Sequence, residues 1–214
     1  MLGMASDGMT VGFDLDMTLV DSRPGIRTTY EALSRETGVF VDAELAVTRL
    51  GPPLEVELAR WFPAERIPEL AVRYRELYPS TAIAPSPAMP GAHEAFRAVR
   101  AGGGRAVVVT AKYTPSAELH LKHLGLEPDV LVGGLWAEAK AEALRTHGAA
   151  AYVGDHTGDV RGARKAGVLS VAVPTGPCDA EELRAAGADV VLMGGLADFP
   201  AWLAACPEAG SSPH

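Results

Sequence analysis

The sequence is poor in the residues that mark several common classes of protein. It has two cysteines, Cys178 and Cys206, in 214 residues, which is too few for a disulfide framework or a cysteine-rich zinc site. We therefore expect a reducing, cytoplasmic setting. No apolar run approaches the roughly eighteen residues that a membrane span needs, and the start of the chain lacks the basic and apolar regions of a signal peptide.

Basic residues are also in the minority. The chain has 19 Lys and Arg against 27 Asp and Glu, which gives a formal net charge of −8. Nucleic acids and anionic membranes select clustered Lys and Arg, so neither is an expected partner. A small anionic substrate is compatible with this charge, because one metal ion or lysine reverses the field inside a cleft.

Short valine-rich runs recur along the chain and predict parallel strands. They are apolar without strict alternation, as strands covered on both faces are. Helical patterns lie between them, over residues 91–101, 115–123, 140–146 and 179–186. This alternation implies right-handed crossovers and an open α/β sheet. The predicted strands are 9–14, 105–110, 129–132, 150–154, 169–173 and 189–192.

One long interval breaks the alternation. Between residues 22 and 89 only helical stripes occur, such as Ile26, Tyr30 and Leu33, and the interval closes with the proline-rich run APSPAMPG. We therefore predict an all-helical module inserted into a Rossmann-like three-layer core with a parallel sheet. The predicted core is 1–21 and 90–208, the module is 22–89, and the tail 209–214 is expected to be disordered.

Candidate site residues follow the predicted strands, because open α/β sheets bind ligands beyond the carboxyl ends of their strands. In VGFDLDMTLVDS, Asp14 and Asp16 lie two positions apart, so they share a strand face and repel each other unless a cation or proton intervenes. Each candidate alone has an ordinary explanation, and GDHTGD alone indicates a turn with an N-capping Asp155 or Asp159. The combination is what indicates a site: Asp14, Asp16, Thr110, Ala111, Lys140, Asp155 and Asp159.

The order DLDMT, VVVTAK, a lysine and GDHTGD resembles the four motifs of the haloacid dehalogenase superfamily, over most of the chain. A helical cap inserted after the first strand is also a trait of that family. The segments RLGPPLEVEL and VPTGPCDAEELRAAGADVVL resemble its phosphoglycolate-phosphatase-like branch. The resemblance implies a Mg²⁺-dependent phosphate-monoester hydrolase for a small phosphorylated metabolite, with an aspartyl-phosphate intermediate and phosphoglycolate as the first candidate substrate.

The resemblance also assigns catalytic roles. Asp14 is the expected nucleophile. Asp16 is expected to protonate the leaving alkoxide and then to deprotonate the hydrolytic water, which requires a proton on one of the two neighbouring carboxylates near neutral pH. Lys140 is expected to steady Asp14 and the developing phosphoryl charge. Thr18 is expected to hold Asp16 in place, and Asp159 to orient Lys140 or a metal-bound water.

A hard, oxygen-ligated Mg²⁺ suits the approach of two anions. By resemblance, its ligands are the side chains of Asp14 and Asp155 and the backbone carbonyl of Asp16. The Thr110 hydroxyl and the backbone N–H of Ala111 are the expected phosphate donors, aimed at the equatorial oxygens of a loose transition state.

Asp16 favours phosphoryl transfer over dehalogenation, because a halide leaving group needs no proton. A phosphomutase stays an alternative, although mutases of this family tend to carry Gly-Val where this chain has Met17-Thr18. A catalytically silent regulatory or binding protein is the other alternative, and the complete motif set argues against it. Substrate specificity is expected to come from residues around Arg49 and from the loop 22–27. Arg49 itself is expected to be mainly solvated. The oligomeric state stays open.

Overall fold

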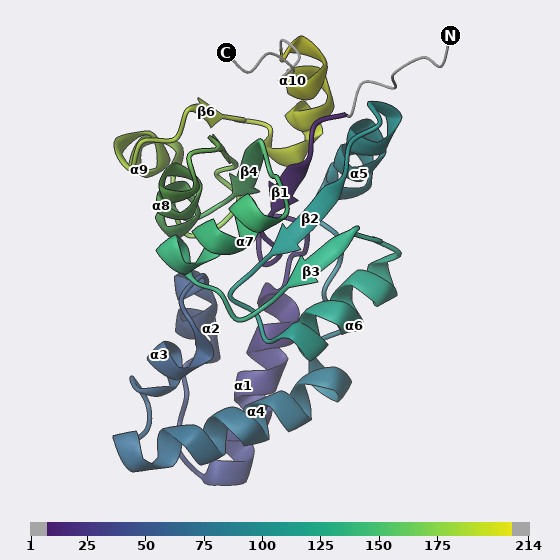
Figure 1. Ribbon diagram of the computed structural model, residues 1–214. Helices are drawn as coiled ribbons and strands as arrows, with labels where there is room; N and C mark the ends of the chain where they lie inside the picture. Colours follow the sequence, from purple (N-terminus) through teal and green to yellow (C-terminus); the bar gives the residue numbers. More distant parts are fainter. Residues whose placement is uncertain (1–7, 207–214) are drawn as a thin grey trace, which may run out of the picture.

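The computed structural model describes residues 8–206 and has one six-stranded parallel sheet with the order β3-β2-β1-β4-β5-β6 (Figure 1). The chain runs outward from β1 to β3 and then returns to place β4 on the other side of β1. This reversal makes the carboxyl ends of β1 and β4 the switch point where such sheets bind ligands. All six predicted strands are present, although shorter at their ends: β1 (Val11–Phe13), β2 (Ala106–Val109), β3 (Val130–Val132), β4 (Ala151–Gly154), β5 (Leu169–Ala172) and β6 (Val190–Val191).

Helices cover both faces of the sheet, which confirms the predicted three-layer α/β fold. Side chains alternate across the strands: Val108 of β2 packs on one face, whereas Val107 and Val109 pack on the other. One face is covered by α5 (Ala92–Ala101), α6 (Thr114–Leu124) and α10 (Phe199–Ala205). The other is covered by α7 (Lys140–Thr146), α8 (Thr157–Ala166) and α9 (Ala180–Ala185).

Helix α8 was not predicted, because Gly158 and Gly162 lower the helix propensity of its sequence. Its N-cap is His156, whose Nδ1 accepts the N–H of Gly158 at 2.9 Å. The Asp159 carboxylate accepts the N–H of His156 at 3.1 Å and completes a capping box. The expectation that Asp155 or Asp159 is the N-cap is therefore wrong. None of the helices within residues 8–206 is both long and apolar enough to cross a bilayer.

Four α-helices lie together beyond one end of the sheet (Figure 1). They share a hydrophobic cluster of their own, in which the rings of Tyr30 and Tyr74 lie 4.9 Å apart between centroids. A bridge between Val20 and Ala88 brings the two connecting segments side by side. These helices are α1 (Arg23–Thr37), α2 (Ala43–Ala46), α3 (Leu54–Leu58) and α4 (Ile67–Thr81). Short 3₁₀ turns are η1 (Val47–Arg49), η2 (Ala64–Arg66), η3 (Ala137–Ala139) and η4 (Gly195–Asp198).

We call residues 23–81 the helical segment. The exact division into core and cap stays a prediction. Residues 207–208 of the predicted core and the whole predicted tail 209–214 lie outside the described residues.

Candidate active site

The loop after β1 is fixed by backbone contacts. The N–H of Asp14 donates to the carbonyl of Val153 in β4 at 2.8 Å, so the strand stays paired up to the first candidate residue. Met17 has a φ of 59°, a left-handed conformation that is uncommon outside glycine. Its carbonyl accepts the hydroxyl of Thr175 at 2.7 Å, which ties the loop to the segment after β5. These contacts hold Asp14 and Asp16 at the carboxyl edge of the sheet.

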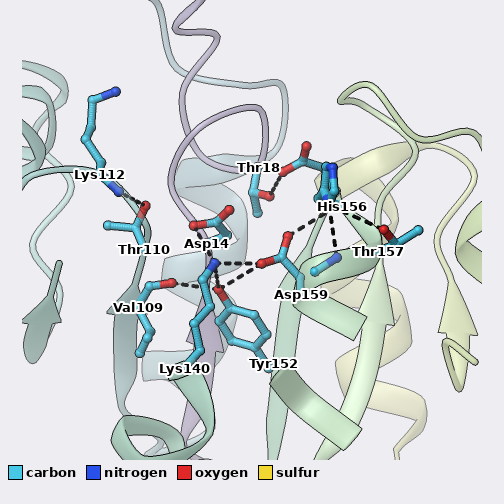
Figure 2. Close-up of polar contacts among 12 residues, drawn as sticks. Asp14, Thr18, Val109, Thr110, Lys112, Lys140, Tyr152, His156, Thr157 and Asp159 are labelled. Carbon is cyan, nitrogen blue, oxygen red and sulfur yellow. Dashed lines mark hydrogen bonds and ion pairs between the residues drawn. The ribbon is translucent and has the colours of Figure 1, made fainter. Parts of the chain in front are cut away.

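Three buried carboxylates and one buried lysine meet at this edge (Figure 2). Oxygens of Asp14, Asp155 and Asp159 all lie within 4.8 Å of one another. The Lys140 Nζ, at the start of α7, lies 3.1 Å from Asp14 Oδ1 and 2.6 Å from Asp159 Oδ1. We call these four residues the acid cluster. The sequence predicted that they converge, and the structure brings them together.

Asp155 is held by groups from two other loops. The Thr18 hydroxyl donates to Asp155 Oδ1 at 2.8 Å. The expectation that Thr18 holds Asp16 in place is therefore wrong, because the turn after β1 directs Thr18 toward β4. On the other side, a Cβ at Gly176 would lie 1.7 Å from Asp155 Oδ2, so the approach of this loop requires glycine.

The acid cluster carries more negative charge than the chain neutralises. Burial raises the pKa of Asp14 to about 7, against the opposing charge of Lys140 and with the help of Asp159 and Asp16. Burial and the charge of Asp159 also hold the pKa of Asp155 well above its usual range. Among the described residues, Asp14 Oδ1 accepts no hydrogen bond of normal geometry. A cluster of three buried carboxylates with a single lysine fits a hard divalent cation, which carboxylate oxygens bind well.

Tyr152 belongs to the site but was missed by sequence reasoning. Its hydroxyl accepts a hydrogen bond from Lys140 Nζ at 2.8 Å and donates to the carbonyl of Val109 at 2.6 Å. Lys140 donates hydrogen bonds to Tyr152 and Asp159 and forms an ion pair with Asp14 (Figure 2). A tyrosine within an apolar strand predicts only a core residue, so the sequence carried no signal for this contact.

Asp16 is not part of the acid cluster and pairs with Lys112, whose Nζ lies 2.7 Å from Asp16 Oδ1. Burial alone would raise the pKa of Asp16, but the charge and hydrogen bond of Lys112 outweigh it and lower the pKa. The raised pKa expected for one of the two neighbouring carboxylates therefore falls on Asp14 rather than on Asp16. Lys112 had no assigned role, although its place two residues after Thr110 put it at the same edge.

The predicted phosphate-binding residues lie at the end of β2. Thr110 is buried, and its hydroxyl oxygen accepts the backbone N–H of Lys112 at 3.2 Å. Figure 2 shows its side chain near Asp14 at the sheet edge. Ala111 lines a cavity of about 360 Å³ that also reaches Asp16 and Tyr74 of the helical segment. The phosphate, nucleophile, acid–base and metal-ligand roles stay predictions.

Comparisons with known proteins agree with this geometry. A model of the haloacid dehalogenase-like hydrolase family matches residues 11–164. The phosphoglycolate phosphatase of Caulobacter vibrioides is 30% identical, over 94% of this chain and 94% of its own. The tyrosine-protein kinase PtkA of Mycobacterium tuberculosis is also 30% identical, over 77% of this chain, but this chain spans only 61% of its length.

A solved structure of a related protein has the same fold as this chain. The haloacid dehalogenase-like hydrolase from Streptococcus pneumoniae is 26% identical and covers 93% of this chain and 100% of its own, with a TM-score of 0.80. The chain belongs to the haloacid dehalogenase-like hydrolase family. The predicted family is thereby confirmed.

Proposed function

We propose that the chain is a Mg²⁺-dependent phosphate-monoester hydrolase that acts on a small phosphorylated metabolite through an aspartyl-phosphate on Asp14. The observation that carries the proposal is the acid cluster, in which three buried carboxylates share one fixed lysine at the carboxyl end of β1. Membership of a hydrolase family and similarity to a phosphoglycolate phosphatase support it.

The side chains of Asp14 and Asp155 and the carbonyl of Asp16 would hold the Mg²⁺. When bound, the ion supplies positive charge that lets the phosphate approach the Asp14 carboxylate. Asp159 lies in the same cluster, but its hydrogen bonds from Lys140 and from the His156 N–H favour an orienting role.

The chain's own residues carry the two chemical steps. An Asp14 oxygen bonds to phosphorus while the bond to the leaving alkoxide breaks and Asp16 gives that alkoxide a proton. Asp16 then takes a proton from water, which attacks phosphorus, releases phosphate and restores Asp14. Lys140 stays fixed beside Asp14 throughout. Because Lys112 keeps the pKa of Asp16 low, the Asp16–Lys112 ion pair has to separate before Asp16 can carry a proton.

We propose that residues 22–89 act as a cap over this site. The cavity between the helical segment and Asp16 supports that role, since a covered site excludes large substrates and stray water. Phosphoglycolate is the first named candidate substrate, from the name of one relative. The complete acid cluster disfavours a catalytically silent protein, and no contact among the described residues favours a phosphomutase.

We also propose a cytoplasmic setting, with a small phosphate ester as partner rather than a nucleic acid or a membrane. Cys178 and Cys206 are both free thiols in the structure, which suits a reducing compartment. The net charge of −8 supports the choice of partner.

The test is release of inorganic phosphate from a panel of phosphorylated metabolites and p-nitrophenyl phosphate. We expect turnover with Mg²⁺, loss of turnover with a chelator, and recovery when Mg²⁺ is added back. Acid quenching during turnover of a ³²P-labelled ester should trap label on Asp14. No turnover of any ester, with Mg²⁺ binding intact by thermal shift, would reject the hydrolase proposal.

A further inference from the structure

The cavity beside Asp16 is much larger than a two-carbon acid requires. Its volume of about 360 Å³ is roughly twelve times the volume of one water molecule in the liquid, which is about 30 Å³. It lies within the size range of sites that enclose whole small-molecule ligands. A glycolate group next to Asp16 would leave most of this volume unfilled.

The charged residues that line the cavity cancel one another. Lys112 pairs with Asp16 at 2.7 Å, and Arg75 pairs with Glu55 at 2.6 Å. The third pair joins Arg49 to Glu57 through two hydrogen bonds. The lining therefore has three basic and three acidic side chains, and each basic one has a carboxylate partner, although Glu57 also lies 3.3 Å from Arg60.

Second contacts hold these cations in place. Glu57 also accepts the indole N–H of Trp61 at 2.9 Å, and the Arg49 guanidinium lies 5.8 Å from the Trp61 ring centroid. Arg75 lies 5.2 Å from the ring centroid of Tyr113. Releasing either arginine to bind a substrate carboxylate would break an ion pair and a ring contact together.

Most of the remaining lining is aromatic or aliphatic, with Ser116 as a polar exception. Tyr30, Tyr74 and Tyr78 form a buried row, with ring centroids 4.9 Å apart for the first two and 5.7 Å apart for the last two. Burial raises the pKa of Tyr78 to about 12, so this row presents neutral rings. Ile26, Leu50 and Leu54 add apolar surface.

We propose that the organic group of the substrate is larger than two carbons, carries no second charge and is mainly apolar or aromatic. This inference rests on the proposed phosphatase function and narrows its substrate class, so that phosphoglycolate, the first candidate by similarity, is replaced by an ester with a larger, uncharged organic group. The phosphate lies at the acid cluster, and the organic group extends past Asp16 into the cavity against the tyrosine row. A carboxylate at the far end of that group would meet Arg49 and Arg75, which are already paired with Glu57 and Glu55.

The first test compares four esters with Mg²⁺: methyl phosphate, phosphoglycolate, benzyl phosphate and 4-carboxybenzyl phosphate. All four leave as alkoxides, so the comparison varies size and charge. We expect kcat/KM for benzyl phosphate to exceed that for each of the others by about tenfold or more, the scale of apolar pocket discrimination. Equal or faster turnover of phosphoglycolate would overturn the inference while leaving the phosphatase in place. Failure of all four and of p-nitrophenyl phosphate would reject the phosphatase itself, and this inference with it.

The second test changes the charge balance. Glu55→Gln removes the carboxylate that matches Arg75, so the ratio of kcat/KM for 4-carboxybenzyl phosphate over benzyl phosphate should rise about tenfold. The matched control is Glu36→Gln, which breaks the exposed Arg73–Glu36 pair of 2.7 Å between α4 and α1. We expect that control to leave the ratio unchanged. An unchanged ratio in Glu55→Gln would contradict the proposed charge exclusion.

The third test changes the size of the cavity. Leu50→Trp should lower kcat/KM for benzyl phosphate about tenfold and leave methyl phosphate nearly unchanged, because only the larger group extends into the filled volume. Leu45→Trp makes the same substitution at an exposed position and should leave both values unchanged. Equal losses for both esters in Leu50→Trp would contradict the proposed position of the organic group.

Discussion

The acid cluster and the neighbouring cavity differ in how their charges are balanced. In the cluster, three buried carboxylates face one lysine, and the pKa values of Asp14 and Asp155 are raised as a result. In the cavity, each of three basic side chains is paired with a carboxylate. Unmatched buried charge is costly unless a ligand completes it, so the cluster is arranged to receive a cation. The matched cavity selects instead by shape and by the absence of free charge.

The largest effect is expected at the nucleophile. Asp14→Asn should reduce turnover by a factor on the order of 10⁴ or more and abolish the acid-stable phosphoenzyme, because an amide cannot attack phosphorus as a carboxylate does. Asp21→Asn is the matched control, since Asp21 is in the same stretch but pairs with Arg23 at 2.8 Å. Turnover retained in Asp14→Asn would rule out the nucleophile assignment.

Removing the one cation of the acid cluster is the next largest perturbation. Lys140→Met leaves three carboxylates in a buried space, so the free energy of unfolding should fall by about 3–5 kcal/mol, the usual cost of a broken buried pair. Urea unfolding measures it, and saturating Mg²⁺ should restore part of the loss. The exposed Lys165→Met serves as control. A decrease in unfolding free energy below about 1 kcal/mol would show that Lys140 is not needed to balance the charge of the three carboxylates.

Asp16 lies between the two regions, and its proposed role as general acid makes the effect of its loss depend on the leaving group of the ester. Asp16→Asn should slow an alkyl phosphate by about 10²-fold or more, the usual contribution of a general acid. The same change should slow p-nitrophenyl phosphate far less, because nitrophenolate leaves without a proton. The comparison uses kcat/KM for both esters, because this ratio reports the step in which the alcohol leaves and excludes the later attack of water, in which Asp16 also acts. Equal losses on both would argue against the acid role.

The pH dependence of stability also distinguishes the acid cluster. With a chelator, folded Asp14 keeps its proton to about pH 7, whereas its ordinary pKa is 3.8. The folded state therefore binds more protons over this range, and Asp14 makes the free energy of unfolding fall as pH rises, by up to about 1.4 kcal/mol per pH unit. Buried His120, whose pKa is lowered to about 3, acts in the opposite direction below pH 6.5.

The measurement is therefore the difference in unfolding free energy between Asp14→Asn and the unmodified protein, from pH 4 to pH 7. His120 contributes equally to both and cancels. We expect the advantage of Asp14→Asn to grow with pH in chelator and to disappear with saturating Mg²⁺. A difference that does not change with pH would contradict the raised pKa of Asp14.

Local sequence patterns predicted the fold and most of the acid cluster for a physical reason. Valine-rich runs predict buried strands regardless of context, and α7 begins at Lys140 as its pattern indicates. Residues at strand ends converge because a parallel sheet brings its carboxyl ends together. Asp14 and Asp155 could be placed by this argument without any knowledge of side-chain contacts.

Contacts between distant side chains could not be predicted in the same way. Lys112 pairs with Asp16 across 96 positions, and Thr18 bonds Asp155 across 137. These pairings depend on the turn after β1, where Met17 adopts a left-handed conformation that its residue type does not predict. Likewise two of the three ion pairs of the cavity, Arg49–Glu57 and Arg75–Glu55, arise only when the helical segment packs together.

The smallest effect on stability is expected at the ion pairs of the cavity, which are partly exposed to solvent. The side chains of Arg75 and Glu55 are 31% and 43% exposed, so Arg75→Met should lower the free energy of unfolding by no more than about 1 kcal/mol. Methionine keeps part of the apolar stem against Tyr113, which limits the loss of packing. Urea unfolding beside Lys140→Met tests the contrast directly. A loss as large as that of Lys140→Met would show that the cavity pairs are as desolvated as the acid cluster, and that charge balance does not separate the two regions.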